Sequence, residues 1–185
     1  MAFIETIPPE QAEGELAAFY ERVGEKRGNV ANVLQVTSLN PKLSHAHLDL
    51  YMSLMYARGG LSRRQRELIA TVVSWANDCA YCIVHHSEAL ARYEEDEALV
   101  EALATDPEAA DLAPGDAGLV AYALKLTRTP SSVRQEDLEA LRALGFDDED
   151  LLAAGAITSY FNFVNRLNLG LGAELEAETE RAYDY

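Results

Sequence analysis

The sequence contains only two cysteines, and they lie three positions apart in the segment Cys79-Ala80-Tyr81-Cys82. Two thiols at this spacing at the start of a helix can form a disulfide, and the helix N-terminus favours the thiolate form of a cysteine. His86 follows Cys82 by one helical turn on the same face, so its imidazole can take the thiol proton. These residue types and their spacing predict a reversible dithiol/disulfide centre with Cys82 as the nucleophile.

A carboxylate that orients this histidine is predicted at Glu67. Asn77-Asp78 has the composition of a break between two helices, and a chain reversal there would create a helical hairpin. Glu67 and His86 would then lie about equally far from the turn, with an axial offset of about 3 Å, whereas Cys82 would be offset from Glu67 by about 9 Å. We therefore expect Glu67 to act on the thiol through His86 or a water, as in a catalytic triad.

The other three histidines are weaker candidates for chemistry. His85 points about 100° away from His86 around the same helix. His45 and His47 follow Pro41 on an earlier helix, where His47 shares an apolar stripe with leucine and tyrosine side chains. This pattern is more typical of a core or interface histidine than of a ligand.

A metal site is the main alternative to redox chemistry, because Cys-x-x-Cys followed by histidine is compatible with zinc. Its ligands would be Cys79, Cys82 and His86, with a fourth from His45, His47 or Glu67. A second Cys/His pair at useful spacing is lacking, whereas closed structural sites need four ligands. Haem attachment is excluded because Ile83 rather than histidine follows the second cysteine, and no βαβ pattern of a thioredoxin-like fold surrounds the motif.

The elements that must position these residues are helices. Asn40 is expected to cap a helix that begins at Pro41 and ends at Gly59-Gly60. Ser62 and Gln65 have the spacing of a capping box at the start of the Glu67 helix. Asp78 is expected to cap the next helix, which would begin at Cys79 and run to about Tyr93.

The rest of the chain also has helical periodicity. A first helix is predicted over residues 10–26, and three more over residues 116–126, 134–144 and 147–169. Ser132 is expected to cap the second of these three, and Asp147 or Asp148 the third. Because no segment alternates β-branched residues with a period of two, the sequence predicts an all-α fold, as a single domain over residues 1–185.

Composition limits the partners that the chain can bind. Acidic residues outnumber basic ones by 31 to 15, which gives a net charge of −16 and disfavours nucleic acid. No apolar run approaches the roughly 18 residues of a transmembrane helix, and the N-terminus has no secretory pattern. Two cysteines are too few for the disulfide scaffold of a small secreted protein, so a cytoplasmic location is expected.

The motif as a whole resembles the signature of the alkylhydroperoxidase D (AhpD)-like proteins, within the carboxymuconolactone decarboxylase superfamily. Eleven residues separate Glu67 from Cys79, and three separate Cys82 from His86. Residues 61–69 and 79–86 are especially similar to the peroxidase-related branch, and so are residues 161–166 near the C-terminus. The likeness covers most of the chain, from about residue 32 to residue 171.

The resemblance implies an all-helical bundle whose central hairpin carries the Cys-x-x-Cys motif, assembled as a homo-oligomer, either a trimer or a hexamer. It implies a peroxidase in which Cys82 attacks a hydroperoxide, Cys79 resolves the sulfenic acid, and His86 with Glu67 relays the proton. An external dithiol or protein reductant would restore the thiols, and no cofactor is expected. The best-known members have a histidine where this chain has Tyr81, so disulfide reduction or redox sensing is the alternative activity. Decarboxylase-like relatives do not use a cysteine pair, which argues against that activity.

Overall fold

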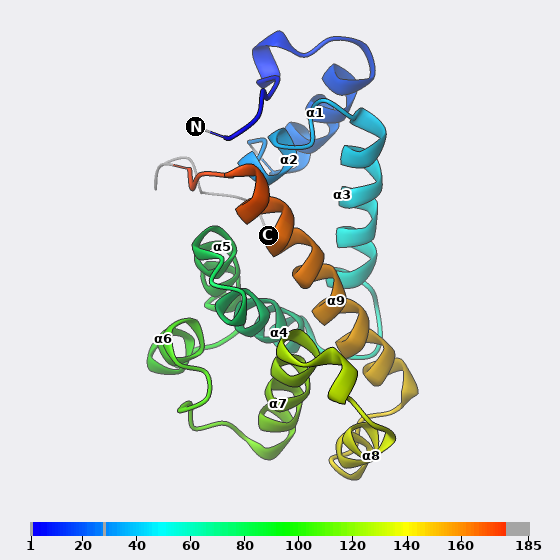
Figure 1. Ribbon diagram of the computed structural model, residues 1–185, viewed down its shortest axis with the longest axis vertical. Coiled ribbons are helices and arrows are strands. Elements are labelled where there is room, and N and C mark those ends of the chain that lie inside the picture. The colour runs from blue at the N-terminus through cyan, green and yellow to red at the C-terminus, as the bar shows by residue number, and fades with distance from the viewer. Residues whose placement is uncertain (1, 28, 177–185) are drawn as a thin grey trace. The chain divides into compact units, whose positions relative to one another are not determined.

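A computed structural model of the chain describes residues 2–27 and 29–176 (Figure 1). The described residues form nine α-helices and two short 3-10 helices and contain no strand, as the all-α prediction requires. No helix among them is both long enough and apolar enough to cross a bilayer. The elements are η1 (Pro9–Gln11), α1 (Gly14–Arg27), α2 (Asn32–Gln35), α3 (Pro41–Met55), α4 (Arg63–Ala76), α5 (Ala80–Leu90), α6 (Glu97–Thr105), α7 (Pro114–Arg128), η2 (Pro130–Ser132), α8 (Gln135–Ala143) and α9 (Asp148–Leu171).

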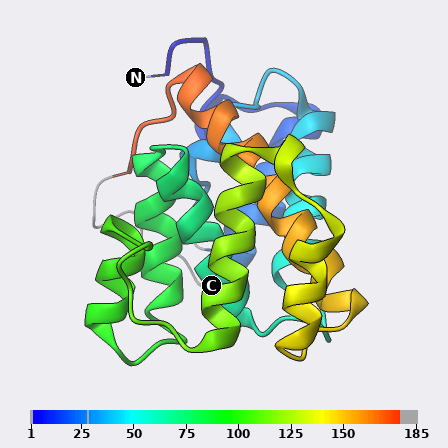
Figure 2. The ribbon, with the colours of Figure 1, turned by 60° about the horizontal axis from the view of Figure 1, so that its bottom comes forward.

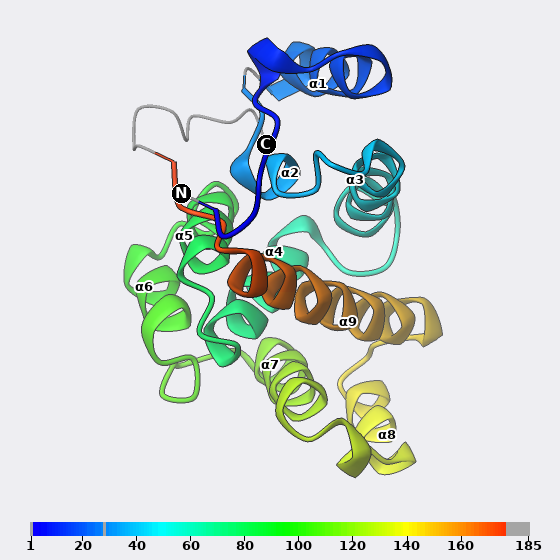
Figure 3. The same cartoon turned by 45° about the horizontal axis from the view of Figure 1, so that its top comes forward.

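The chain divides into two units, which we describe separately. The first comprises Met1–Met52 and Leu167–Tyr185, and the second comprises Ser53–Arg166. Figure 3 shows α9 as one continuous helix (orange), most of which belongs to the second unit. The expectation of a single domain over residues 1–185 stays a prediction.

The second unit is built around a hairpin of α4 and α5. The Ser62 hydroxyl accepts the backbone N–H of Gln65, and the Gln65 side chain accepts that of Ser62, so the predicted capping box begins α4. Helix α5 packs along α4, and α6 and α7 also contact α4; the order of these helices can be followed by colour in Figure 2. Because residues 66–74 of α4 are all buried, this helix forms the core of the unit.

The turn between α4 and α5 differs from the prediction at Asp78. Its backbone is left-handed, with φ of 58°, and it does not cap the helix that follows. Cys79 occupies the N-cap position instead, and α5 begins at Ala80 and ends at Leu90 rather than near Tyr93. A tight reversal needs a residue in the left-handed region, and Asp tolerates that region better than most side chains because it is short and polar.

Other helices and caps also differ from expectation. The first predicted helix is interrupted at Ala12, whose backbone is extended, so a 3-10 turn precedes α1. Helix α6 was not predicted, although Asp96 caps it by accepting the N–H groups of Ala98 and Leu99. Ser132 does not cap α8; its hydroxyl donates to the Thr129 carbonyl within η2.

Two further predicted caps are present where expected. The Asn40 side chain accepts the N–H of Leu43 in the first turn of α3. The Asp147 carboxylate accepts the N–H groups of Glu149 and Asp150 at the start of α9. Both caps satisfy backbone donors that have no partner within the helix.

His47 of α3 is buried in the first unit, as expected for a structural histidine. Desolvation by burial lowers the pKa of His47 to about 4. An unfolded chain takes up this proton near pH 6.5, whereas the folded chain does so only near pH 4. Above about pH 6.5, His47 therefore does not lower the free energy of unfolding. Below that pH, protonation of the unfolded chain lowers it.

We expect acidification to destabilise the fold through His47. The contribution is constant above about pH 6.5 and is lost as the pH falls, by roughly 3 kcal/mol at pH 4. Urea unfolding of the wild type and of His47→Gln at pH 7 and pH 4 measures it, because Gln cannot take up the proton. Equal losses of stability in the two proteins would contradict the prediction.

Candidate active site

Glu67 of α4 and His86 of α5 are in direct contact across the hairpin. The distance between His86 Nδ1 and Glu67 Oε2 is 2.7 Å, and the two residues are 8% and 0% exposed. A carboxylate at this distance accepts the Nδ1 proton and leaves Nε2 as the ring atom that exchanges a proton with its surroundings. The contact between Glu67 and His86 that the predicted hairpin implies is therefore present, and the Glu67 carboxylate is buried.

Arg63 holds the second oxygen of the same carboxylate. Its Nε and Nη2 lie 2.9 Å and 2.5 Å from Glu67 Oε1, and its guanidinium carbon lies 3.9 Å from the centre of the Tyr56 ring. Both oxygens of the buried carboxylate therefore have a donor, as burial of a charge requires. The sequence analysis did not identify Arg63, although its spacing of four residues from Glu67 is that of a helical ion pair.

The two cysteines are both buried and both reduced. Cys79 is the N-cap residue of α5, and Cys82 lies in the first turn of that helix. A hydrogen bond with the Cys82 side chain lowers the pKa of Cys79, as do the backbone N–H of Cys82 and the Asn165 side chain, against the opposite effect of burial. These interactions favour the thiolate form of Cys79.

Asn165 of α9 reaches this turn from the other end of the sequence. It is completely buried; its Nδ2 donates to Ser74 Oγ over 3.1 Å, and its Oδ1 accepts from Asn77 Nδ2 over 2.9 Å. Ser74 in turn accepts the backbone N–H of Cys79 with its carbonyl, at 3.0 Å. The sequence resemblance had included this segment of α9 without assigning Asn165 a role.

Aromatic side chains surround the two histidines of α5. The ring of Phe161 meets that of His86 edge to face, with centroids 4.5 Å apart. His85 instead contacts the ring of Tyr81, also at 4.5 Å, and both of these side chains are buried. The two neighbouring histidines of α5 therefore have different surroundings, as their angular separation around the helix requires.

The metal alternative receives no support from the geometry. Within residues 2–27 and 29–176, no group of three or more His, Cys, Asp or Glu side chains is placed to hold a metal ion. His45 and His47 belong to the first unit, where the His45 ring lies against Phe19 and its Nδ1 is 3.2 Å from Arg22 Nη2.

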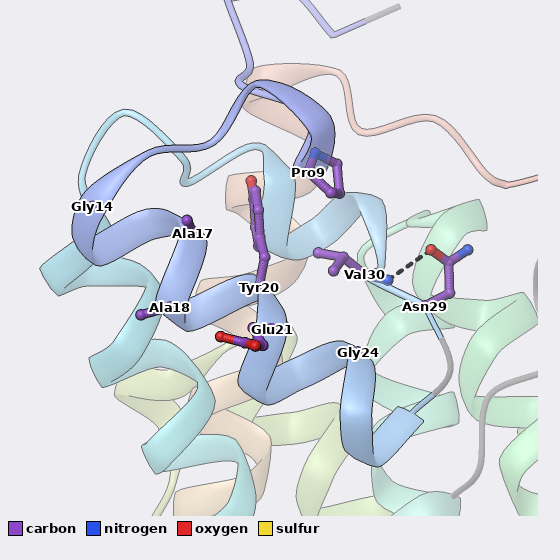
Figure 4. A pocket seen from close by; sticks show the side chains of 9 residues that line it. All are labelled: Pro9, Gly14, Ala17, Ala18, Tyr20, Glu21, Gly24, Asn29 and Val30. Atoms are coloured by element: carbon purple, nitrogen blue, oxygen red, sulfur yellow. Dashed lines mark hydrogen bonds between the residues drawn. The ribbon is translucent and has the colours of Figure 1, made fainter.

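A pocket of about 740 Å³ also lies in the first unit, beside α1 (Figure 4). The Val30 N–H donates to Asn29 Oδ1 at its edge, over 2.8 Å. The pocket contains none of the predicted site residues, and most of its lining side chains are small or apolar. They are Pro9, Gly14, Ala17, Ala18, Tyr20, Glu21, Gly24, Asn29 and Val30.

The chain is similar to one known protein family and to several solved structures. The model of the carboxymuconolactone decarboxylase family matches residues 41–125. Among curated proteins, none matches the chain significantly.

Solved structures match over nearly the whole chain. A peroxidase-related protein from Ralstonia eutropha JMP134, described as an alkylhydroperoxidase AhpD core, is 30% identical with a TM-score of 0.87, over 96% of this chain and 93% of that one. A peroxidase-related protein from Silicibacter sp. TM1040 is 32% identical with a TM-score of 0.82, over 95% and 89%. The debrominase Bmp8, as a cysteine-to-alanine variant with 2,3,4-tribromopyrrole, is 20% identical with a TM-score of 0.77, over 96% and 95%, which shows a shared fold alone.

Proposed function

Because the chain belongs to the AhpD-like proteins of the carboxymuconolactone decarboxylase superfamily, we propose that it is a thiol-dependent peroxidase that reduces hydroperoxides with Cys79 and Cys82. The observation that carries the proposal is the buried hydrogen bond of 2.7 Å between Glu67 and His86, one helical turn from Cys82. A histidine oriented by a carboxylate beside a thiol is the arrangement that activates a nucleophile.

The first step oxidises Cys82. His86 takes the thiol proton, and the Cys82 sulfur attacks one oxygen of the hydroperoxide. The S–O bond forms as the O–O bond breaks, so the sulfur becomes a sulfenic acid and the leaving alkoxide receives the proton from His86. The hydrogen bond from Glu67 supports this step because it stabilises the imidazolium that forms.

The second step closes the disulfide. Cys79 attacks the sulfenic sulfur as a thiolate, the S–S bond forms, and hydroxide leaves and is protonated to water. The lowered pKa of Cys79 supports this resolving role, because the thiolate is the attacking form. In sum, one dithiol and one hydroperoxide give one disulfide, one alcohol and one water, and an external dithiol then reduces the disulfide by exchange.

The burial of both cysteines favours a small oxidant. Cys79 and Cys82 are 1% and 2% exposed, so a small hydroperoxide reaches the sulfurs more readily than a protein disulfide does. One observation favours disulfide exchange as a second candidate function: the pKa of Cys79, the first cysteine of the Cys-x-x-Cys motif, is lowered, as in disulfide oxidoreductases. The homo-oligomeric state, as a trimer or hexamer, stays a prediction from the family.

We expect each molecule of hydroperoxide to consume two thiols of the reduced protein. Stopped-flow mixing with hydrogen peroxide and with an organic hydroperoxide, followed by thiol titration under denaturing conditions, measures the rate and the stoichiometry. If both thiols remain reduced in excess peroxide, the proposed peroxidase activity is refuted. Rapid oxidation by a small disulfide in the same assay would then identify disulfide exchange as the activity.

A further inference from the structure

We infer that Arg63 is a positioning residue of the proposed proton relay: its guanidinium holds one oxygen of the Glu67 carboxylate and thereby directs the other, as part of a charged group, at His86. The inference rests on the proposed activation of Cys82 by His86, but not on a peroxide being the substrate. Glu67 is 0% exposed, and a carboxylate in such a place stays charged only where protein groups replace the lost water. Arg63 supplies both a donor and a positive charge.

The two oxygens of the Glu67 carboxylate have separate partners. Arg63 Nε donates to Oε1 over 2.9 Å, and Arg63 Nη2 lies 2.5 Å from the same oxygen. The other oxygen, Oε2, lies 2.7 Å from His86 Nδ1. An arginine frequently spreads its fork over both oxygens of a carboxylate, whereas Arg63 places two nitrogens on one of them. This arrangement fixes the rotation of the carboxylate and leaves Oε2 for the imidazole.

The guanidinium of Arg63 is itself held in place. Its Nη1 donates to the Met55 carbonyl over 3.1 Å, and its guanidinium carbon lies 3.9 Å from the centre of the Tyr56 ring and 5.8 Å from that of Tyr93. The side chain is only 14% exposed. Because these contacts restrict the rotamers of Arg63, the entropy of ordering it is lost on folding rather than during the reaction.

The place of Arg63 in its helix argues against a purely local role. Arg63 is the first residue of α4, where a positive side chain opposes the helix macrodipole. An ion pair four residues apart is also more favourable when the acidic residue comes first, which is the reverse of the order here. Helix stability alone therefore disfavours arginine at this position, and the contact with Glu67 is what offsets the cost.

The charge on Glu67 matters when Cys82 loses its proton. Transfer of that proton to His86 creates an imidazolium, which an ionised carboxylate stabilises and a neutral one does not. Without Arg63, the buried carboxylate would take up a proton or turn towards water, because burial disfavours an uncompensated charge. Either change leaves the imidazolium less stable, so less thiolate forms on Cys82.

The test is the rate at which iodoacetamide alkylates Cys82 at neutral pH, because the thiolate is the form that reacts. Cys79→Ser serves as the background, so that one thiol remains. We expect Arg63→Met to slow alkylation by roughly tenfold, since it removes a hydrogen bond between charged groups. Arg63→Lys keeps the charge without the planar fork and should stay within about threefold of the background rate. Circular dichroism shows whether each variant is folded.

A double-mutant cycle with Glu67→Gln tests whether Arg63 acts through Glu67. In the Glu67→Gln protein, Arg63→Met should change the alkylation rate by less than about twofold, because no charge remains to be held. Equal slowing with and without Glu67→Gln would overturn the inference, since an effect on the fold alone is additive. If Arg63→Met does not fold, Arg63→Gln, which also lacks the charge, takes its place in the cycle.

Arg64→Met is the matched control. Arg64 is the next residue of the same helix, and its ion pairs with Glu94 and Asp116 measure 2.6 Å and 2.5 Å. The variant loses the same side chain without removing a contact of Glu67, so its alkylation rate should stay within about twofold of the background. Slowing as large as in Arg63→Met would contradict a specific role of Arg63.

His86→Gln separates this inference from the proposed function on which it rests. If His86→Gln slows alkylation of Cys82 and Arg63→Met does not, the role of Arg63 alone is overturned. If His86→Gln leaves the rate unchanged, the activation of Cys82 by His86 is overturned, and the role of Arg63 with it. Because iodoacetamide is the only reagent, neither result depends on whether the substrate is a hydroperoxide.

Discussion

Replacing Cys82 with serine should lower peroxide turnover by at least about a thousandfold, because the hydroxyl of serine is a far weaker nucleophile than a thiolate. Serine keeps the shape of the buried site, so the fold should be preserved. Steady-state peroxide consumption with a dithiol as reductant measures the loss. The unfolding curve of the same variant shows whether turnover is lost because the thiol is missing or because the fold is destabilised.

The companion variant Cys79→Ser separates the two sulfurs. It should react with one equivalent of peroxide and stop as a sulfenic acid on Cys82, which a dimedone adduct detected by mass spectrometry identifies. This comparison matters because the pKa of Cys79, the proposed resolving residue, is itself lowered by hydrogen bonds. If turnover is retained in Cys82→Ser but lost in Cys79→Ser, then Cys79 is the nucleophile and Cys82 is the resolving residue.

Glu67→Gln should reduce turnover by roughly a hundredfold while leaving both thiols in place. Glutamine keeps the size of the side chain but not the charge that stabilises the imidazolium of His86, so the proton leaves Cys82 less readily. Removing the side chain altogether, in Glu67→Ala, should also destabilise the fold by about 3–5 kcal/mol, because Arg63 loses its buried partner. Turnover and chemical unfolding of both variants test the two effects separately.

Glu108→Gln serves as the control for the loss of a carboxylate. Glu108 forms an ion pair with Arg128 over 2.9 Å, and both side chains are well exposed to solvent. Exposed pairs contribute little to stability, so this variant should resemble the wild type in turnover and unfolding. If Glu67→Gln turns over at the wild-type rate, the carboxylate of Glu67 has no role in the mechanism.

The sequence predicted those parts of the site that local geometry determines. Helical periodicity puts His86 one turn after Cys82, and a hairpin at Asn77-Asp78 brings Glu67 opposite His86 by simple counting of residues. The capping box at Ser62 likewise depends on residues close in sequence. Such contacts follow from the dimensions of a helix, and the structure has the Glu67–His86 contact at 2.7 Å.

The remaining features depend on contacts that no local pattern specifies. Asn165 bonds Ser74 across 91 positions of sequence, and the helical pattern of α9 alone gives no direction for that side chain. Asp is a common N-cap residue, which predicts a cap at Asp78, but the reversal of the chain needs a left-handed residue there instead. Asp96, by contrast, is a common type of N-cap residue, so the start of α6 does have a local signal in the sequence.

The position of both cysteines at the start of α5 also affects how the proposed peroxidase would respond to excess peroxide. A sulfenic acid on Cys82 would form next to Cys79, with which it already interacts. Condensation to the disulfide would therefore be intramolecular and fast. Irreversible conversion to sulfinic acid requires a second peroxide to arrive before that condensation. We therefore expect the proposed enzyme to resist overoxidation to sulfinic acid when peroxide is briefly in excess. Its turnover would instead be limited by the supply of reductant.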